Sequence, residues 1–413
     1  MSLFNVFSIL MVLAAALAYI NYRYLRLPPT IGLMALSLIL SVGLVLSGRV
    51  YTEPVQWAQA LVKQLDFENL LLKVMLGFLL FAGAIHVNLK VLKARLVPIL
   101  VLASVGILLS TALVGLLTWQ MLPLLGLNVP LSHCLVFGAL ISPTDPIAVL
   151  GILKQAAIPK ILEVQVTGES LFSDGVAVIV FSTLLGIAQV DAPLSMGAIA
   201  LNFGQEVFGG ALFGALLGYT GFRLMKPINN YQVEVMITLA LVMGGYWLAG
   251  ILHVSGPIAL VVAGLITGND ILNNAVDDVT RDYLTKTWEM IDEVLNALLF
   301  LLIGLEIVAI KQGWGLLAAG LAASILVLVS RFVSVWVTLL ALRLRYAFES
   351  GTTRILTWGG LRGGISVAMA LSLPEALNRE VLLALTYIVV VLSILVQGLS
   401  IGPLSKRILK TAA

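Results

Sequence analysis

Apolar residues run along this chain in long blocks, and short polar stretches separate the blocks. Thirteen blocks are roughly 17–30 residues long, near or above the roughly 20 residues that a helix needs to cross a bilayer. We therefore predict an all-α polytopic membrane protein with thirteen transmembrane helices. The stretch Asn273–Thr287 is amphipathic instead, and we expect it to be interfacial or part of the loop before the tenth helix. The blocks are 5–22, 29–47, 68–86, 96–119, 131–153, 161–188, 197–222, 231–251, 254–269, 288–309, 314–342, 352–373 and 380–404.

The fifth block, 131–153, contains two prolines, Pro143 and Pro146, on either side of a Thr-Asp pair. Each proline removes a backbone donor and moves the residue before it away from the helical conformation. We expect the helix to break near Thr144 and to restart at Pro146, with Asp145 as the N-cap. The break frees backbone carbonyls, and such backbone at membrane depth is tolerated only where it is buried in protein or lines a cavity.

The twelfth block, 352–373, carries a cluster of glycines around Arg362. Each glycine weakens a helix by about 1 kcal/mol relative to alanine, so we expect a second break there. Spans one to six and spans eight to thirteen can then form inverted six-helix repeats, with span seven as the link. Transporters of that design place their site where the broken helices of the two halves meet. Close helix packing is a second reason for the glycines, and both reasons can hold. The glycines are Gly359, Gly360, Gly363 and Gly364.

The composition makes any charge inside a block informative. Hydrophobic residues are 60% of the chain and charged residues only 11%, against about 25% charged in soluble domains. Yet the stretch 140–182 holds three carboxylates, Asp145, Glu169 and Asp174. A charge near the bilayer centre costs about 2.5–3.5 kcal/mol, so these residues indicate function. Asp174 lies about 21 Å along a helix from Lys160, near the middle of the membrane.

Ser170 and Ser173 share one side of the predicted sixth helix with the carboxylates of that helix. The arc is polar between apolar flanks, so it faces protein or water. Hard oxygen donors suit a Na⁺-sized cation, and the candidates are the Asp174 carboxylate, the Ser170 hydroxyl and the Thr144 carbonyl, with Asp145 and Ser173. A desolvated Asp174 then holds either a proton or a cation, which is exchange by competition. The alternatives are a structural hydrogen-bond network on the arc and a capped kink without a ligand at Asp145.

The motif Thr144-Asp-Pro, followed by Gly168-Glu-Ser-x-x-x-Asp174, resembles the cation–proton antiporter superfamily. It is closest to the sodium/proton exchanger branch, the NhaP-like proteins, and the resemblance covers essentially the whole chain. It implies an NhaA/NhaP-like fold in which broken helices 5 and 12 cross. It also implies a secondary transporter, not an enzyme, that exchanges Na⁺, or else Li⁺ or K⁺, for H⁺. Ser173 departs from the branch, which usually has Asn at this position.

A deep arginine points to a buried charge pair. Arg331 lies about 18 Å along a helix from Arg343, too far to reach the interface, so it needs a carboxylate partner. The resemblance implies that this partner is Glu169, which leaves Asp174 as the group that titrates. The residues expected to support the broken helices are Arg362, Gly360, Gly363, Pro143 and Pro146.

The resemblance also divides the chain into two structural parts. It implies a moving core at 95–190 and 311–413, and a scaffold at 1–94 and 191–310 that includes the linker helix and forms a homodimer. It implies no cofactor besides the transported ions, and no nucleic-acid partner. Because Ser173 cannot carry a proton, we expect electroneutral 1:1 exchange. Electrogenic or K⁺-selective exchange is the alternative, with a second titrating carboxylate.

Three other classes of membrane protein share parts of this sequence pattern. An ion channel would use a symmetric pore with rings of carbonyls or charges, and one deep site with broken helices argues against it. An intramembrane aspartyl protease would use two Asp residues on neighbouring helices, which Asp145 and Asp174 fit superficially. That chemistry needs neither an inverted repeat nor Arg331 and Arg362. A sodium-coupled solute carrier is a further alternative within transporters. One Cys and three His show no clustered metal-ligand pattern.

Basic residues predict the orientation in the membrane. Of the 24 Lys and Arg residues, seventeen lie in loops on one side and four on the other. The positive-inside rule then places the N-terminus outside and the C-terminus in the cytoplasm, in the cell membrane of a prokaryote by the resemblance. Acidic residues near the span ends are expected mostly at solvated rims, some of them in an ion funnel. These acids are Glu206, Glu234, Glu289, Asp292, Glu293 and Glu306.

Overall fold

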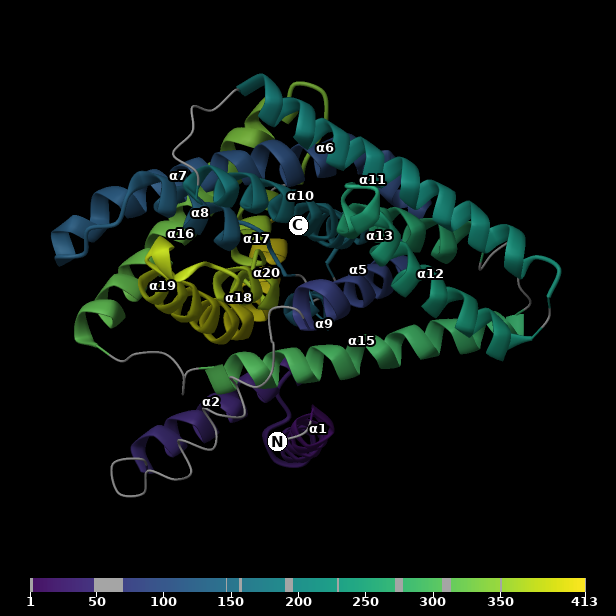
Figure 1. Cartoon of the computed structure of the whole chain (residues 1–413), viewed down its shortest axis with the longest axis horizontal. Helices are drawn as coiled ribbons and strands as arrows, with labels where there is room; N and C mark the ends of the chain where they lie inside the picture. The colour runs from purple at the N-terminus through teal and green to yellow at the C-terminus, as the bar shows by residue number, and fades with distance from the viewer. Residues whose placement is uncertain are drawn as a thin grey trace.

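The computed structural model is helical throughout the residues that it describes, and these residues form no β-strand (Figure 1). Eight of their helices are long and apolar enough to cross a membrane, and three more are apolar but shorter. The described ranges are 3–47, 70–145, 147–155, 158–189, 196–228, 230–271, 278–306, 313–349 and 351–412.

The helices follow one another along the chain with short connections. In the first half they are α1 (Leu3–Ile20), α2 (Pro29–Ser47), α5 (Leu76–Ile85), α6 (Leu89–Val101), α7 (Ile107–Met121), α8 (Leu131–Ile141), α9 (Ile147–Gln155) and α10 (Lys160–Gln189). In the second half they are α11 (Met196–Met225), α12 (Tyr231–Ile251), α13 (Gly256–Ile266), α15 (Asp278–Glu306), α16 (Trp314–Leu342), α17 (Thr352–Trp358), α18 (Gly364–Leu371), α19 (Arg379–Leu392) and α20 (Gly398–Ala412). Short turns of π- or 3₁₀-helix lengthen several of them, at Asn21–Leu25, Leu70–Met75, Leu102–Gly106, Leu122–Leu125, Thr267–Ile271, Glu375–Leu377 and Ser393–Gln397.

The described part of each of the thirteen apolar blocks falls on a helix or on a helix with a break. The all-α membrane fold is therefore confirmed, while the count of thirteen membrane crossings stays a prediction. The last helix runs further than predicted, because α19 and α20 are continuous through the π-helical turn Ser393–Gln397 and end at Ala412.

The fourth helix begins earlier than the apolar pattern predicted. The side chain of Asn88 caps it by accepting hydrogen bonds from the backbone N–H groups of Lys90 at 3.0 Å and Val91 at 3.3 Å. Leu92 is buried in this charged first stretch, so packing holds the turn that composition assigned to a loop. The expected core boundary at residue 95 lies inside this helix, which begins at Leu89.

Of the two alternatives for Asn273–Thr287, the loop is wrong for the described part, and the interfacial position stays a prediction. Residues 278–287 are the first turns of the long helix α15, and residues 273–277 lie outside the described ranges. Tertiary contacts explain the difference. Trp288 is fully buried against Phe81, with ring centroids 4.6 Å apart, and its Nε1–H donates to Thr238 Oγ1 at 3.1 Å. These contacts hold the helix against α5 and α12 at the first residue of its apolar block, directly after the amphipathic stretch.

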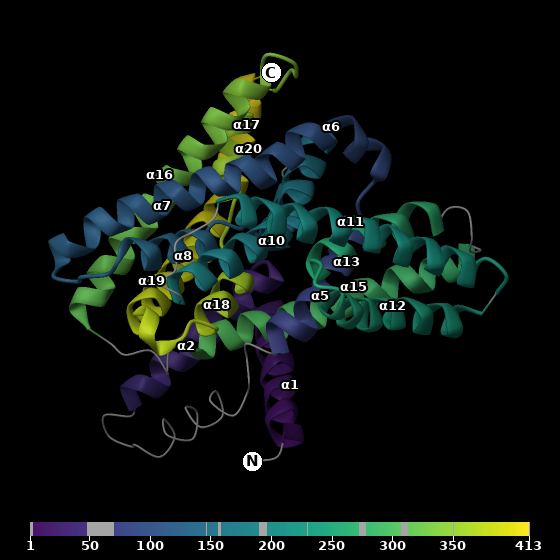
Figure 2. The same cartoon turned by 45° about the horizontal axis from the view of Figure 1, so that its top comes forward.

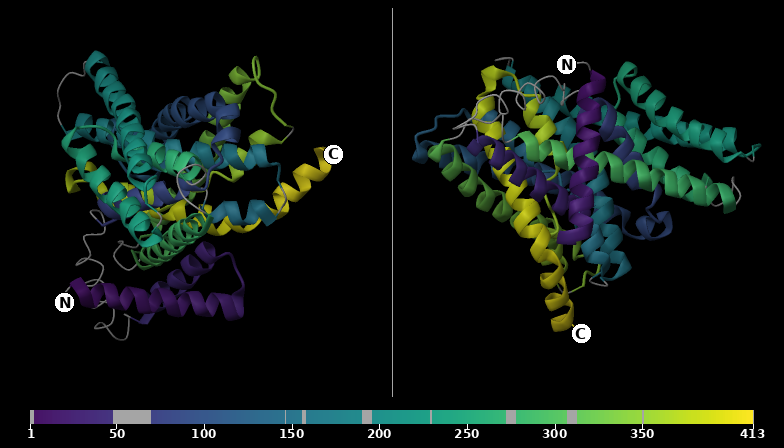
Figure 3. Two further views of the ribbon diagram at one scale, coloured as in Figure 1. Left: turned by 90° about the vertical axis from the view of Figure 1, so that its right-hand side faces the viewer. Right: turned by 90° about the horizontal axis from the view of Figure 1, so that it is seen from below.

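The helices gather into two groups, which Figure 1 shows side by side. One group holds α5, α11, α12 and α13, and the other holds α7, α8 and α16 to α20. Helix α10 packs on members of both groups, and α15 runs across the lower part of Figure 1 between α5 and α12 on one side and α1 and α2 on the other. Helix α1 begins and helix α20 ends at opposite ends of the molecule (Figures 2 and 3).

Candidate functional site

The two broken helices cross each other in the group that contains α8 and α18. The backbone N–H of Asp145, in the break between α8 and α9, donates to the carbonyl of Leu361 at 2.8 Å. Leu361 lies in the break between α17 and α18, and the two residues form an isolated antiparallel bridge. The predicted breaks in the fifth and twelfth helices, and their crossing, are confirmed. Pro146 lies outside the described residues, so its place at the start of α9 stays a prediction.

Arg362 satisfies the carbonyls that the first break leaves without a helical partner. Its Nη1 donates to the carbonyl of Ser142 and, at 2.9 Å, to the carbonyl of Pro143. Its own backbone N–H donates to Ser393 Oγ at 3.0 Å. The residue is 2% exposed, and buried carbonyls without partners would be costly, so this cation stabilises the crossing as a unit.

Two glycines allow the breaks to approach closely. A Cβ added at Gly363 would overlap the side chain of Asp145. A Cβ added at Gly360 would lie 2.8 Å from Arg331 Nε and 3.1 Å from Thr144 Cγ2. Neither glycine has a positive φ, so close packing is the reason for their small size. The expected supporting role of these glycines has a steric basis in the fold.

Helix α10 brings its polar arc against the first break. The Ser170 hydroxyl donates to the carbonyl of Thr144, so two of the predicted ion ligands lie beside each other. The Ser173 hydroxyl donates to the Ser170 carbonyl at 3.0 Å and thus bonds its own helix. Asp174 is 7% exposed, and no hydrogen bond or ion pair joins its carboxylate to another described residue.

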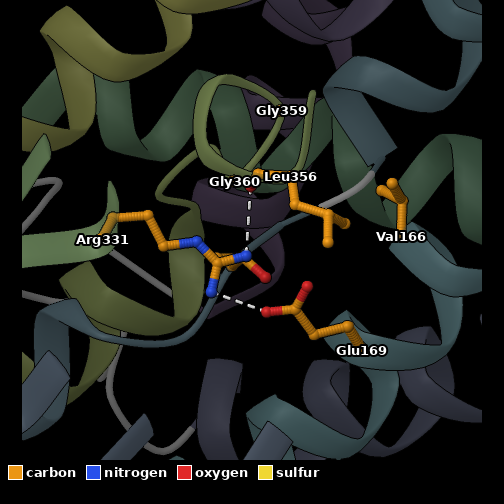
Figure 4. Close-up of a pocket in the computed structure, with 7 residues that line it drawn as sticks. Val166, Glu169, Arg331, Leu356, Gly359 and Gly360 are labelled. Atoms are coloured by element: carbon orange, nitrogen blue, oxygen red, sulfur yellow. Dashed lines mark hydrogen bonds and ion pairs between the residues drawn. The ribbon is translucent and has the colours of Figure 1, made fainter. Parts of the chain in front are cut away.

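Glu169 has a different neighbourhood from Asp174. Its Oε1 lies 2.6 Å from Nη1 of Arg331, and both side chains are almost fully buried. Nη2 of Arg331 also donates to the carbonyl of Leu356 at 3.2 Å, which ties α16 to α17. Figure 4 shows the pair beside a small cavity of about 10 Å³, which Thr144 and Gly360 also line. The structure thus places together the two residues that the resemblance paired.

Asp292 is one of the acids expected near the span ends, and no pattern in the sequence assigned it to the ion site. The carboxylate of Asp145 lies within electrostatic range of both Asp174 and Asp292. Asp292 Oδ1 is buried and has no hydrogen-bond partner among the described residues. The sequence signal was its position four residues before Asn296 on one helix face, directly ahead of an apolar run. That signal does not reveal which distant residue it faces.

Two other acids near span ends are buried, so the expectation of a solvated rim is wrong for them. Glu234 is 1% exposed and Glu306 is 6% exposed. Glu234 lies in the first turn of α12, a helix that Trp288 joins to α15, and this packing removes it from solvent. Among the described residues, no group of three or more His, Cys, Asp and Glu side chains could hold a resident metal ion.

Comparison with known proteins agrees with this geometry. Residues 12–407 match the family described as "Sodium/hydrogen exchanger, transmembrane". The chain belongs to this family. It is 52% identical over 403 residues to the Na⁺/H⁺ antiporter NhaP of Pseudomonas aeruginosa, covering 96% of this chain and 95% of the relative. It is 32% identical over 410 residues to the Na⁺/H⁺ antiporter NhaH of Halobacillus dabanensis, covering 97% of each chain.

A solved structure confirms the fold independently. The sodium proton antiporter MjNhaP1 of Methanocaldococcus jannaschii aligns with a TM-score of 0.78, covering 99% of this chain and all of that chain, at 19% identity. The sodium/hydrogen exchanger family consists of transporters, so this protein is a transporter and not an enzyme. The channel and aspartyl-protease alternatives are therefore not favoured. The roles of the individual site residues remain predictions.

Proposed function

We propose that this sodium/hydrogen exchanger trades Na⁺ for H⁺ by competition at Asp174. One observation carries the proposal: two carboxylates five residues apart on α10 have opposite environments. Glu169 is held in an ion pair with Arg331, whereas no described residue pairs with the carboxylate of Asp174. A carboxylate that no cation of the protein neutralises is the one that can alternate between a proton and a transported ion.

The neighbouring oxygens suit a small hard cation. We assign the Asp174 carboxylate, the Ser170 hydroxyl and the Thr144 carbonyl as ligands of the transported Na⁺, with Asp145 close by. The hydrogen bond from Ser170 to the Thr144 carbonyl supports this set, because it keeps both oxygens at the crossing. Ser173 would act on the backbone of its own helix, where its hydroxyl donates to the Ser170 carbonyl.

We further propose that the site alternates between the two membrane faces by movement of a core against a scaffold. The core would hold residues 89–190 and 311–413, and the scaffold residues 1–88 and 191–310, which would also form a homodimer. The two helix groups of Figure 1 support this division. The opposite positions of the start of α1 and the end of α20 support an odd number of crossings. The distribution of basic residues would then place the N-terminus outside and the C-terminus in the cytoplasm.

The exchange is proposed to be electroneutral, with one Na⁺ for one H⁺. Neither Ser173 nor Glu169 would act as a second carrier beside Asp174 on α10. Ser173 has no charge to exchange, and Glu169 is paired with Arg331. One positive charge then leaves for each that enters. No resident cofactor is needed for this mechanism.

Transport by the purified protein tests the proposal. The protein would be reconstituted in proteoliposomes that hold a preset ΔpH, and Na⁺, Li⁺ or K⁺ would be added outside in separate runs. We expect Na⁺ to dissipate the ΔpH in a saturable manner, with choline as the inactive control cation. Equal dissipation by choline, or none by any of the three cations, would be inconsistent with cation–proton exchange.

A further inference from the structure

A second hollow lies away from the crossing, between α16, α17 and α20. Its volume is about 590 Å³, which far exceeds the cavity beside Glu169. Leu328 and Phe332 of α16 form one wall, and Pro403 and Leu404 of α20 form another. We call this hollow the α16–α20 groove. Figure 2 shows α16, α17 and α20 running side by side toward the C-terminus.

Two arginines line the same end of this groove. Helices α17 and α20 are pinned to each other where Trp358 Nε1–H donates to Ser400 Oγ at 2.9 Å. Arg354 lies four residues before Trp358, and Arg407 lies seven residues after Ser400. The two helices are antiparallel, since Gly351 lies against Ile408. Both arginines therefore lie on the same side of the Trp358–Ser400 hydrogen bond, about 6 Å and about 10 Å from it along their helices. The groove therefore has an apolar length and one cationic end.

This pattern matches the chemistry of one class of ligand. Guanidinium groups bind phosphate oxygens through paired, charge-assisted hydrogen bonds. The apolar wall includes Phe332, 45% exposed, on a helix long and apolar enough to cross a membrane, where acyl chains are the surrounding solvent. We propose that the α16–α20 groove binds one anionic glycerophospholipid, with its phosphate at Arg354 and Arg407 and its acyl chains along α16 and α20.

The position of the groove connects this lipid to the crossing of the broken helices. Trp358 directly precedes Gly359, where the second break begins, and Phe332 directly follows Arg331, which pairs with Glu169. A lipid in contact with Trp358 and Phe332 would hold the end of α17 and the part of α16 that carries Arg331. Lipid binding does not depend on the proposed ion exchange, whereas any effect of the lipid on transport rests on it.

Lipid binding is tested by melting temperature and native mass spectrometry of the full-length protein in detergent. The probes are phosphatidylglycerol, phosphatidylcholine with the same acyl chains, and soluble glycerol phosphate. We expect phosphatidylglycerol to raise the melting temperature of the wild type and to remain bound in the mass spectrum. Phosphatidylcholine should bind at least about tenfold more weakly, because its quaternary ammonium cancels the net charge of the headgroup and places a positive charge near the two arginines. Glycerol phosphate should not stabilise the protein.

The test variant is the double substitution Arg354→Gln with Arg407→Gln. The control variant is Arg223→Gln, at the exposed end of α11. The double variant should lose the preference for phosphatidylglycerol by about tenfold or more, while the Arg223 variant keeps it. Leu328→Trp, which fills the apolar length, should weaken both lipids. Equal stabilisation of the double variant, or equal stabilisation by glycerol phosphate, would overturn the lipid site.

The dimer signal in the same spectra, together with Na⁺-driven exchange in proteoliposomes of each lipid, distinguishes the other possible outcomes. Loss of the dimer in the double variant, with lipid adducts unchanged, would show that the groove binds a second copy of the chain and would overturn the proposal. Absence of Na⁺-driven exchange in every lipid would refute the proposed transport and leave the lipid-binding result standing. A wild-type protein that exchanges ions but binds both lipids equally would refute only the groove.

Discussion

Glu169 and Asp174 lie five positions apart on α10, yet their carboxylates meet different partners. Arg331 neutralises Glu169 at 2.6 Å, and the same arginine bonds the carbonyl of Leu356. The ion pair therefore belongs to the structure that holds α10, α16 and α17 together. Asp174, one helix turn and a half further on, is buried without such a pair, which gives it the role of carrier in the proposed exchange.

Breaking the buried pair should reduce stability before it alters ion affinity. In Arg331→Met, Glu169 is left as an uncompensated buried charge, which costs about 3–5 kcal/mol. We expect a clearly lower melting temperature in detergent. In Glu169→Met with Arg331→Met, both charges are gone, so much of that loss should be recovered. A double variant as unstable as the sum of the two single variants would contradict the pairing.

Asp292 should strengthen cation binding through its charge. Its carboxylate lies within electrostatic range of Asp145, and Asp292→Asn removes a negative charge without changing the shape of the side chain. We expect the apparent KM for Na⁺ to rise by up to about tenfold, which corresponds to about 1.4 kcal/mol of lost attraction. Glu289→Gln, an exposed acid on the same helix, is the control and should leave the KM unchanged. An identical KM for Na⁺ in the two variants would show that Asp292 does not contribute to cation binding.

At the scale of elements, the two broken helices form one structure. The bridge between Asp145 and Leu361 joins their backbones, and Arg362 of one break holds the carbonyls of Ser142 and Pro143 in the other. Neither break would satisfy its own polar groups alone at this depth. The crossing is therefore a rigid frame around Thr144, and α10 presents its carboxylate to that frame.

A methyl group at the crossing should disturb this frame. In Gly363→Ala, the new Cβ would overlap the Asp145 side chain, and overpacking of this kind costs about 1–3 kcal/mol. We expect lower stability and a lower rate of Na⁺-dependent exchange. Gly186→Ala on α10 is the matched control, because a Cβ there meets no atom within 4 Å. Equal effects of the two substitutions on the exchange rate would show that the close approach of Gly363 to Asp145 is not required for transport.

The sequence predicted these elements where a single residue type determines the backbone. Pro143 and the glycines around Arg362 located both breaks, and the deep position of Arg331 predicted a carboxylate partner. The start of α15 could not be predicted in this way, because contacts of Trp288 with α5 and α12 hold it. The proximity of Asp292 to Asp145 was equally hidden, since it depends on how helices far apart in the sequence pack.

At the scale of the whole molecule, the arrangement fits a transporter with a central site. Helix α10 packs on both helix groups, so the carboxylate of Asp174 lies where relative movement of the groups would change its access to solvent. The MjNhaP1 structure has the same fold. The groove between α16, α17 and α20 lies on the outside of the same group that holds the crossing.

The stoichiometry of exchange is a property of the whole transport cycle. With Asp174 as the only carrier, one Na⁺ replaces one H⁺, and a membrane potential does no work on the cycle. In proteoliposomes with a clamped potential and no ion gradient, we therefore expect no accumulation of Na⁺, and Ser173→Asn should behave in the same way. Na⁺ accumulation driven by voltage alone would establish a second carrier, for which Asp145 is the nearest candidate.

The central claim is that the carboxylate of Asp174 alternates between Na⁺ and H⁺. The most direct measurement is Na⁺-driven dissipation of ΔpH in proteoliposomes that contain equal amounts of wild-type protein, Asp174→Asn or Asp282→Asn. Asp282 is an exposed acid on α15 in an ion pair with Lys286, so its variant controls for the loss of a carboxylate. We predict full exchange in the wild type and the Asp282 variant, and none in a folded Asp174→Asn protein. Na⁺-dependent exchange by purified Asp174→Asn at a rate near that of the wild type would contradict the account.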